Sequence, residues 1–162
     1  MTKPKLPKRL DDEAYDRHYI PMTYEMGMYM MDHLRRLYRE FDGDLSMAIV
    51  LGEIGHHNAR HFVRDILPRS GTDARTLGTA EVIGKASRPC NALSVAEASG
   101  IPRETVRRKV EKLVKLGFVT RDAQGGLHTT RAVAAKFKPF DRHTIEELLA
   151  LAERVHRLAG KD

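Results

Sequence analysis

The sequence predicts a mainly α-helical protein with a single small β-hairpin. Three observations lead to this fold class. Residues 94–117 have the pattern of a short helix, a tight turn and a longer basic helix, and residues 118–130 have the pattern of two short strands around a glycine turn. Outside this stretch, apolar residues recur at the three- and four-residue spacing of amphipathic helices. A chain of 162 residues is long enough for one compact domain with helical extensions.

The short helix is expected to begin at Ser94. Ser94 and Glu97 have the S-x-x-E spacing of a capping box, in which each side chain accepts a hydrogen bond from the other residue's backbone N–H. Gly100 tolerates the left-handed conformation in which helices end. Pro102 suits the first position of a new helix, because its missing N–H would be unpaired there. A tight turn over residues 99–102 therefore joins two helices.

The longer helix is expected over about residues 102–116. Val106, Val110 and Leu113 recur at i, i+4 and i+7 and predict its core-facing stripe. A helix with one apolar stripe and many charges is most often a solvated surface helix. Residues 101–117, however, contain six Lys and Arg against two Glu, so the exposed face is strongly basic.

A β-hairpin is expected directly after this helix. Residues 118–121 and 127–130 read as its strands, and Gln124-Gly125-Gly126 can adopt the positive φ that a hairpin tip requires. Helix, turn, helix and hairpin in this order are the layout of a winged helix-turn-helix, whose second helix enters the major groove of DNA. The wing, at about residues 121–128, would lie on the DNA backbone or in the minor groove.

The run Ile101-Pro-Arg-Glu-Thr-Val-Arg-Arg resembles the recognition helix of GntR-type regulators. The chain layout, with helices on both sides of a central winged helix, resembles the MarR family. Both are families of bacterial transcription regulators that usually act as homodimers. The resemblance implies a sequence-specific regulator that binds an inverted repeat as a homodimer, without indicating repression or activation. It also implies that Arg103, Glu104, Thr105 and Arg107 match positions that such helices present to bases.

The candidate DNA-binding residues come from the second helix and the hairpin. Arginine early in a recognition helix can donate two hydrogen bonds to guanine O6 and N7, and basic residues further along can pair with phosphates. The candidates are Arg103, Glu104, Thr105, Arg107, Arg108, Lys109, Lys112, Arg121, Gln124, His128 and Arg131.

The distribution of charge gives a second argument for nucleic acid. The net charge of the chain is +6. Residues 85–140 contain 12 Lys and Arg against 4 Asp and Glu, whereas the rest of the chain contains 16 against 18. The positive excess therefore lies in the segment that contains the expected winged helix, as phosphate binding requires.

The flanking segments are expected to form helices over about residues 22–41, 45–66 and 141–159. Asp42-Gly43-Asp44 would end the first helix and cap the second, and Pro139 would separate the hairpin from the last. The first helix has two apolar stripes rich in Met, Tyr and Leu, which need more than one surface to cover them. We expect packing within the subunit and across a homodimer interface, with an adaptable ligand-binding surface as the alternative.

This organisation divides the chain into four regions: a flexible basic arm over 1–20, an N-terminal helical dimerisation region over 21–70, a winged helix-turn-helix domain over 71–138 and a C-terminal dimerisation helix over 139–162. A short helix around residues 79–86 would begin the winged domain. In the second region, small residues on one helix face predict a close helix crossing, within the subunit or across a two-fold axis: Ala48, Gly52, Gly55 and Ala59.

Three other residues have alternative interpretations. His57 and His61 are spaced i, i+4, which can hold one metal ion, but no third ligand is evident nearby. Packing or interface histidines are the more ordinary interpretation. Cys90 is the single cysteine, so the chain has no intrachain disulfide and suits a reducing cytoplasm. It is either a redox sensor or a small buried side chain.

Other classes of protein have little support. We expect no enzyme, because the sequence has no paired acid–base residues, phosphate loop or nucleophile motif. No apolar run approaches the roughly 20 residues of a membrane span, so a cytoplasmic protein without a membrane partner is expected. We expect no cofactor and no bound metal. The expected partners are double-stranded DNA and a second copy of the chain, and a small-molecule effector is left open. A winged helix used as a protein-interaction adaptor, without sequence-specific DNA binding, is the alternative.

Overall fold

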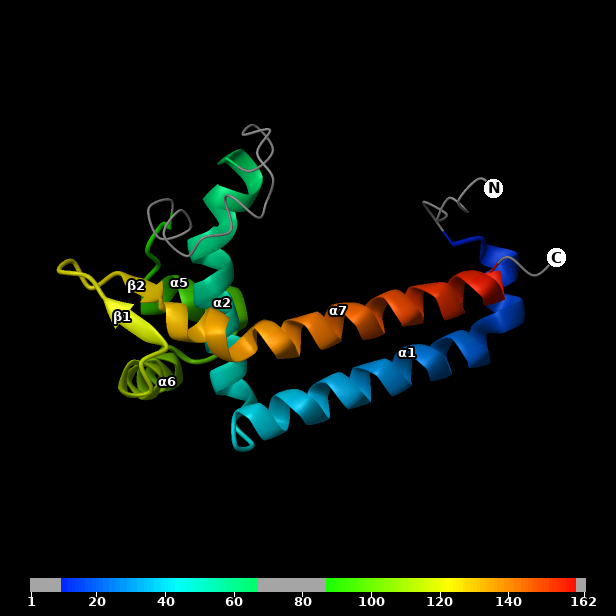
Figure 1. The fold of residues 1–162 in the computed structure, drawn as a ribbon, viewed down its shortest axis with the longest axis horizontal. Helices are drawn as coiled ribbons and strands as arrows, with labels where there is room; N and C mark the ends of the chain where they lie inside the picture. The colour runs from blue at the N-terminus through cyan, green and yellow to red at the C-terminus, as the bar shows by residue number, and fades with distance from the viewer. Residues whose placement is uncertain (1–9, 67–86, 160–162) are drawn as a thin grey trace. The chain divides into compact units, whose positions relative to one another are not determined.

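The computed structural model describes residues 10–66 and 87–159 (Figure 1). As predicted, these residues are mainly α-helical and include one two-stranded antiparallel hairpin. No helix in the two described ranges is long and apolar enough to cross a membrane. The short helix expected around residues 79–86 lies outside the described residues.

The chain divides into two compact units. The first contains the described residues 10–40 and 138–159, and we name it the two-helix unit. The second contains the described residues 41–66 and 87–137, and we name it the hairpin unit.

Helix α1 (Asp12–Glu40) belongs to the two-helix unit and begins well before the expected residue 22. The segment 1–20 is therefore not a flexible arm throughout, because it is helical from Asp12 onward. Asp11 caps this start, since its carboxylate accepts a hydrogen bond at 2.9 Å from the backbone N–H three residues on. The helix bends at His18, whose φ of −111° and ψ of 17° are not helical. Pro21 follows the bend, in the first turn of the next helical segment, where a missing N–H costs little.

Helix α7 (Arg131–Ala159) contains Pro139, at which the sequence predicted a break. The expected start near residue 141 is therefore wrong. The Ala- and Lys-rich residues before Pro139 favour a helix, and proline removes only one of its backbone hydrogen bonds. Packing just after the proline offsets that loss, because the Phe140 ring lies 5.7 Å from the His33 ring.

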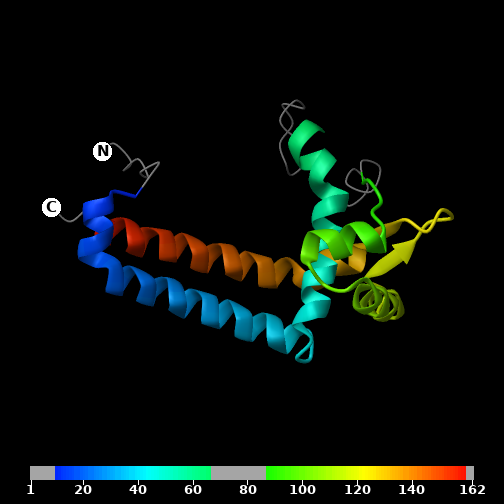
Figure 2. The same cartoon turned by 180° about the vertical axis from the view of Figure 1, so that it is seen from behind.

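In the two-helix unit, α1 and the second part of α7 run antiparallel and side by side in both views (Figures 1 and 2). Arg154 Nε donates to Glu25 Oε2 at 2.7 Å, and Arg36 Nη1 donates to Thr144 Oγ1 at 3.4 Å. The Arg36 guanidinium also lies 5.1 Å from the centre of the Phe140 ring. Polar and cation–π contacts therefore hold the two helices in register.

Helix α2 (Leu45–His61) crosses the hairpin unit. Asp44 caps it, as predicted, by accepting a hydrogen bond from the Met47 N–H at 3.0 Å. The sequence predicted one helix to residue 66, but the last turn widens into the π-helical segment η1 (Phe62–Ile66).

Helix α5 (Ala92–Ser99) begins earlier than the Ser94 capping box predicted. The cap is Asn91, whose side-chain oxygen accepts from the Ser94 N–H at 2.9 Å. Gly100 ends the helix in the left-handed conformation, with φ of 70°, as expected. Helix α6 (Arg103–Lys115) begins two residues after Ile101, and Pro102 is its N-cap, whereas the sequence predicted it as the first helical residue.

The hairpin consists of β1 (Val119–Arg121) and β2 (Leu127–Thr129), in the register Val119 to Thr129 and Arg121 to Leu127. Its tip contains Gly125, with φ of 82°. Cys90 forms an isolated antiparallel bridge with Leu127 on the other side of β2. The hairpin unit thus has a small three-segment β-layer.

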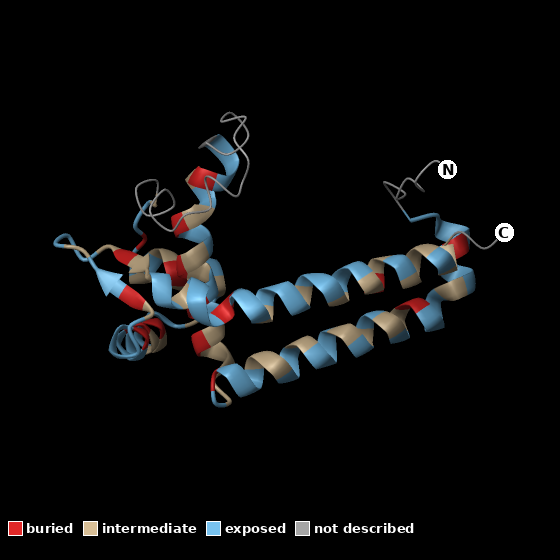
Figure 3. Ribbon diagram, viewed as in Figure 1, coloured by how far each residue is buried: buried red, intermediate tan, exposed pale blue. Residues whose placement is uncertain are grey.

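The core of the hairpin unit lies between α2, α6 and the hairpin (Figure 3). Its fully buried side chains are Val50, Ile54, Val106, Val110, Leu113, Val119 and Leu127. The stripe of small residues on α2 does not form a close crossing among the described residues. A Cβ at Gly52 would meet no atom within 4 Å, and a Cβ at Gly55 would only touch Thr129 Cγ2 at 3.8 Å.

Candidate nucleic-acid interface

The apolar face of α6 fixes which of its side chains face solvent. Val106, Val110 and Leu113 are completely buried, as their spacing predicted. Because a helix turns by 100° per residue, the positions opposite this stripe are those three to four residues apart on the far side. They are Glu104, Arg108, Glu111 and Lys115, and all four are exposed.

A buried hydrogen-bond network holds the hairpin beside this helix. Asn58 on α2 is 2% exposed, and its side-chain nitrogen donates to the Arg88 carbonyl at 2.8 Å and to the Leu127 carbonyl at 3.0 Å. Its oxygen accepts from the Thr129 N–H at 2.8 Å. One side chain therefore joins α2 to β2 and to the segment before α5. The sequence analysis did not single out Asn58, because an asparagine within a helix has no sequence signal that separates a buried from an exposed position.

Arg107 is held by glutamates of its own helix. Its Nε and Nη2 donate to the two oxygens of Glu104, at 3.0 and 2.8 Å, and its Nη1 pairs with Glu111. The guanidinium raises the acidity of its partner, because the hydrogen bond from Arg107 holds the pKa of Glu104 below its ordinary value. The expected guanine contact of Arg107 would therefore require these ion pairs to open.

Lys109 faces the start of α2. Its Nζ lies 2.7 Å from Asp44 Oδ2, and both side chains are largely buried. Lys112 Nζ lies 3.9 Å from the same oxygen and is more exposed. Burial raises the pKa of Asp44, but hydrogen bonds from Lys109 and from the Met47 N–H outweigh it and leave that pKa below its ordinary value. Lys109 thus joins α6 to α2 and is not free for a ligand.

The hairpin tip is organised by Asp122. Its Oδ1 accepts from the N–H groups of Gln124 at 3.0 Å and Gly126 at 2.7 Å, and its Oδ2 lies 3.1 Å from His128 Nε2. The Gly126 N–H and then His128 hold the pKa of this carboxyl below its ordinary value. His128 is therefore part of the turn. A side chain at Gly126 would collide with Asp122 and with Pro89, so this position requires glycine.

The structure divides the predicted site residues into three groups. Exposed cations without an ion-pair partner among the described residues are Arg103, Arg108, Arg121 and Arg131. Residues tied to a neighbour are Glu104, Arg107, Lys109, Lys112 and His128. Thr105 is partly buried, and Gln124 is exposed at the hairpin tip. Lys115, which the sequence analysis left aside, lies on the outward face with Arg108.

The two-helix unit carries a second notable surface. Large apolar side chains remain exposed along both of its helices, including Tyr24 at 64%, Tyr38 at 56%, Ile145 at 57% and Leu149 at 61%. Several methionines of α1 are also about half exposed: Met26, Met28, Met30 and Met31. The apolar stripes that the sequence predicted are therefore only partly covered by α7.

The structure also describes His57, His61 and Cys90, for which the sequence left two interpretations open. His57 is exposed, and the partly buried His61 has its Nδ1 2.8 Å from Asp65 Oδ2, so neither is a core packing residue of α2. Within the described ranges, no three His, Cys, Asp or Glu side chains converge as metal ligands would. Cys90 is 5% exposed, and burial raises the pKa of its thiol to about 11.

Comparison with protein-family models, with curated proteins and with solved structures found no match to this chain. Function is therefore inferred from the residues and their geometry. The exposed surface of α6, which carries arginines and glutamates, and the exposed apolar side chains of the two-helix unit are the two candidate interaction surfaces.

Proposed function

We propose that this protein is a winged helix-turn-helix regulator that binds double-stranded DNA in a sequence-specific way. The observation that carries the proposal is the exposed surface of α6, where Arg108 on the outward face and Arg103 in the first turn are exposed cations without ion-pair partners among the described residues. The helix is anchored from behind by three fully buried side chains, so its exposed face is rigid. Arginine in such a position can read guanine in the major groove.

The order and pairing of elements support the same proposal. Helices α5 and α6 are joined by the left-handed turn at Gly100, and the hairpin follows α6 directly. In Figures 1 and 2, α6 is seen almost along its axis, next to the hairpin of the same unit. A recognition helix with a wing beside it has this arrangement. Arg121, at the end of β1, and Arg131, at the start of α7, would contact phosphates.

We further propose that the regulator is a homodimer, joined through the two-helix unit. Large apolar side chains left exposed along both helices are typical of a surface that a partner covers. A second copy would cover the exposed Tyr, Met, Ile and Leu side chains of α1 and α7 and complete a helical bundle. Two-fold symmetry would then favour an inverted-repeat site.

The salt dependence of DNA binding tests the proposed roles of α6 and of the hairpin. Each phosphate contact that is lost should lower the slope of log K against log salt by about 0.9. We expect Arg108→Gln and Arg121→Gln each to weaken binding of a 30-base-pair duplex by about 1 kcal/mol or more, with a shallower slope for Arg121→Gln. Arg39→Gln, an exposed charge change in the two-helix unit, is the matched control and should leave affinity within twofold. Equal affinity of all three variants and the wild type would contradict the proposal.

Light scattering after gel filtration tests the dimer. Ile145→Lys with Leu149→Lys places two charges on the exposed apolar face and should convert a dimer to a monomer without loss of helical signal. A wild-type monomer at 50 μM would contradict this part of the proposal.

One observation favours the adaptor alternative. Glu104 and Glu111 lie on the outward face of α6 and neutralise Arg107, which gives a mixed surface of the kind that also binds proteins. An adaptor predicts weak DNA binding without sequence preference that disappears at physiological salt.

A further inference from the structure

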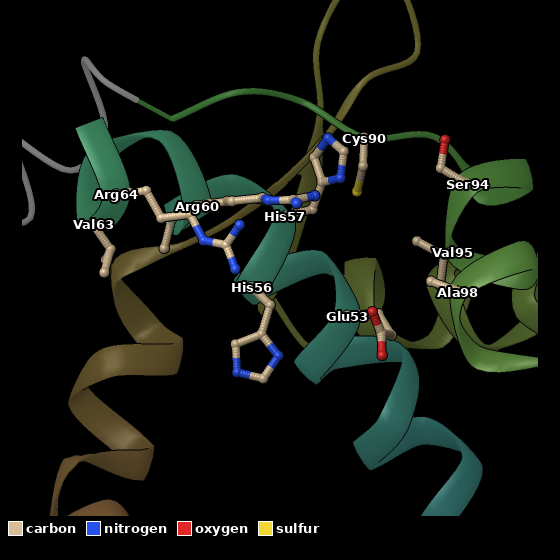
Figure 4. A pocket seen from close by; sticks show the side chains of 11 residues that line it. Glu53, His56, His57, Arg60, Val63, Arg64, Cys90, Ser94, Val95 and Ala98 are labelled. Carbon is tan, nitrogen blue, oxygen red and sulfur yellow. The ribbon is translucent and has the colours of Figure 1, made fainter. Parts of the chain in front are cut away.

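A depression of about 470 Å³ lies in the hairpin unit, between α2 with η1 on one side and α5 on the other (Figure 4). Its volume is in the range of natural small-ligand sites. None of the predicted DNA-binding residues lines it. It is therefore separate from the outward face of α6.

The wall formed by α2 and η1 is basic. Arg60 and Arg64 are one helical turn apart, and the His56 and His57 side chains lie on the same wall. None of these four side chains has a hydrogen bond or ion pair to another described residue. Glu53, at the edge, is the single acidic residue among the described lining. Two guanidinium groups on one concave wall, without partners in the described part of the chain, favour an anion, which they can bind through charge-assisted hydrogen bonds.

The opposite wall is apolar. It is formed by Val95 and Ala98 of α5, with the Cys90 thiol beside them, and Val63 adds an apolar group on the basic side. Cys90 itself contributes little charge, because burial raises the pKa of its thiol to about 11. A ligand that binds to both walls has an anionic group for the arginines and a compact apolar body for the wall formed by α5.

A second depression, of about 380 Å³, adjoins the first and shares His57, Arg60 and Arg64 with it. Arg88 adds a third arginine there, and Asp65 is already paired with His61. The excess of positive charge among the described lining residues therefore extends across both depressions. This continuity strengthens the preference for an anion over a neutral ligand.

We propose that the depression between α2 and α5 is a binding site for a small organic carboxylate with a compact apolar body. The carboxylate pairs with Arg60 and Arg64, and the apolar body lies against Val95 and Ala98. The site does not depend on DNA binding by α6, so it can be tested on the protein alone.

The test is titration of the ¹⁵N-labelled full chain with cyclohexanecarboxylate and 4-methylpentanoate, followed by amide chemical shifts. We expect saturable shifts at Arg60, Arg64, Ser94 and Val95, with cyclohexanecarboxamide as the uncharged probe giving none. The double variant Arg60→Gln, Arg64→Gln should bind the carboxylates at least about tenfold more weakly than the wild type, because each lost charge-assisted hydrogen bond weakens binding substantially. Arg39→Gln should bind like the wild type.

Three results would overturn the proposal: no saturable shift at these amides with either carboxylate, equal affinity for the carboxamide, or unchanged affinity in the double variant. Arg60 and Arg64 are exposed and have no ion-pair partner among the described residues, so their replacement should leave the thermal unfolding midpoint unchanged. Circular dichroism on the same samples verifies that loss of binding is not loss of fold. If the wild type binds neither carboxylate and the double variant loses DNA affinity, the cluster is a phosphate-contacting surface and the ligand-site proposal is wrong.

Discussion

The side-chain oxygen of Asn58 accepts a hydrogen bond from the backbone N–H of Thr129 at 2.8 Å. The same side chain donates to the carbonyls of Leu127 and Arg88. Asn58 therefore satisfies three backbone groups of the small β-layer from a helix that is remote in sequence. This side chain therefore anchors β2 to α2.

Replacing Asn58 should be costly. Asn58→Ala leaves buried backbone donors and acceptors unpaired, and we expect a loss of about 3 kcal/mol in the free energy of unfolding. Urea denaturation followed by circular dichroism measures it. Asn91→Ala is the matched control, because it removes an exposed helix cap and should cost only about 1 kcal/mol. Equal losses in the two variants would mean that the network around Asn58 is not a main support of the hairpin.

Asp44 has two roles that two variants can separate. Asp44→Asn keeps the helix cap and removes the ion pair with Lys109, so a loss of about 0.5–1 kcal/mol is expected. Asp44→Ala removes both and should cost about 2 kcal/mol. Because the pKa of Asp44 is lowered in the folded protein, its contribution is present above the ordinary aspartate value of 3.8 and is lost as the pH falls below it. Urea denaturation at pH 7 and at pH 3.5 should therefore show the gap between wild type and Asp44→Asn narrowing in acid. An unchanged gap would argue against the ion pair.

Cys90 should react slowly in the native protein. A thiol pKa of about 11, compared with a reference value of 9.0, leaves about 100-fold less thiolate at pH 7.5, and burial adds to this protection. Alkylation by iodoacetamide, followed by mass spectrometry, should be at least about 100-fold slower in native protein than in urea. Comparable rates in the two states would restore the redox-sensor interpretation of this cysteine.

His33 should make the two-helix unit sensitive to acid. Burial, and secondarily the Arg36 charge, lower its pKa below 6.5, while Asp32 opposes the shift. The folded state therefore binds fewer protons than the unfolded state, and stability falls as the pH drops through about 6.5. Thermal midpoints between pH 7.5 and 5.5 should decline less steeply in His33→Gln than in the wild type. His143→Gln, at an exposed position of α7, should retain the wild-type slope. Parallel slopes in all three proteins would exclude His33 as the cause.

Local sequence patterns were sufficient to predict the parts of the fold that depend on neighbouring residues alone. The buried stripe of Val106, Val110 and Leu113 and the turn at Gly100 follow from helical spacing and from the conformational freedom of glycine. The predicted start of α5 at Ser94 was wrong because Asn91, three residues earlier, is an equally good N-cap. The bridge between Cys90 and Leu127 fixes the chain just before Asn91, and that contact is not local.

The sequence predicted which side chains of α6 face solvent, but it did not predict which of them form ion pairs. The outward position of Arg108 follows from the helix period, whereas the contact of Lys109 with Asp44 joins residues 65 apart in sequence. The continuous helix through Pro139 was likewise not predicted, because a contact between residues far apart in the sequence helps to stabilise it. A proline in a helix interior costs about 3 kcal/mol, and tertiary contacts such as that of Phe140 with His33 help to offset the loss.

Selection of bound sequences from a random duplex pool tests the central claim most directly. The full chain at physiological salt should enrich an inverted repeat with half-site centres about 10 base pairs apart, because two α6 helices would enter successive major grooves on one face of DNA. The selected duplex should bind about 10³-fold or more tightly than a random one. Arg108→Gln should reduce this ratio, and Arg39→Gln should not. A pool without an enriched motif, with equal affinity for selected and random duplexes, would contradict sequence-specific DNA recognition by α6.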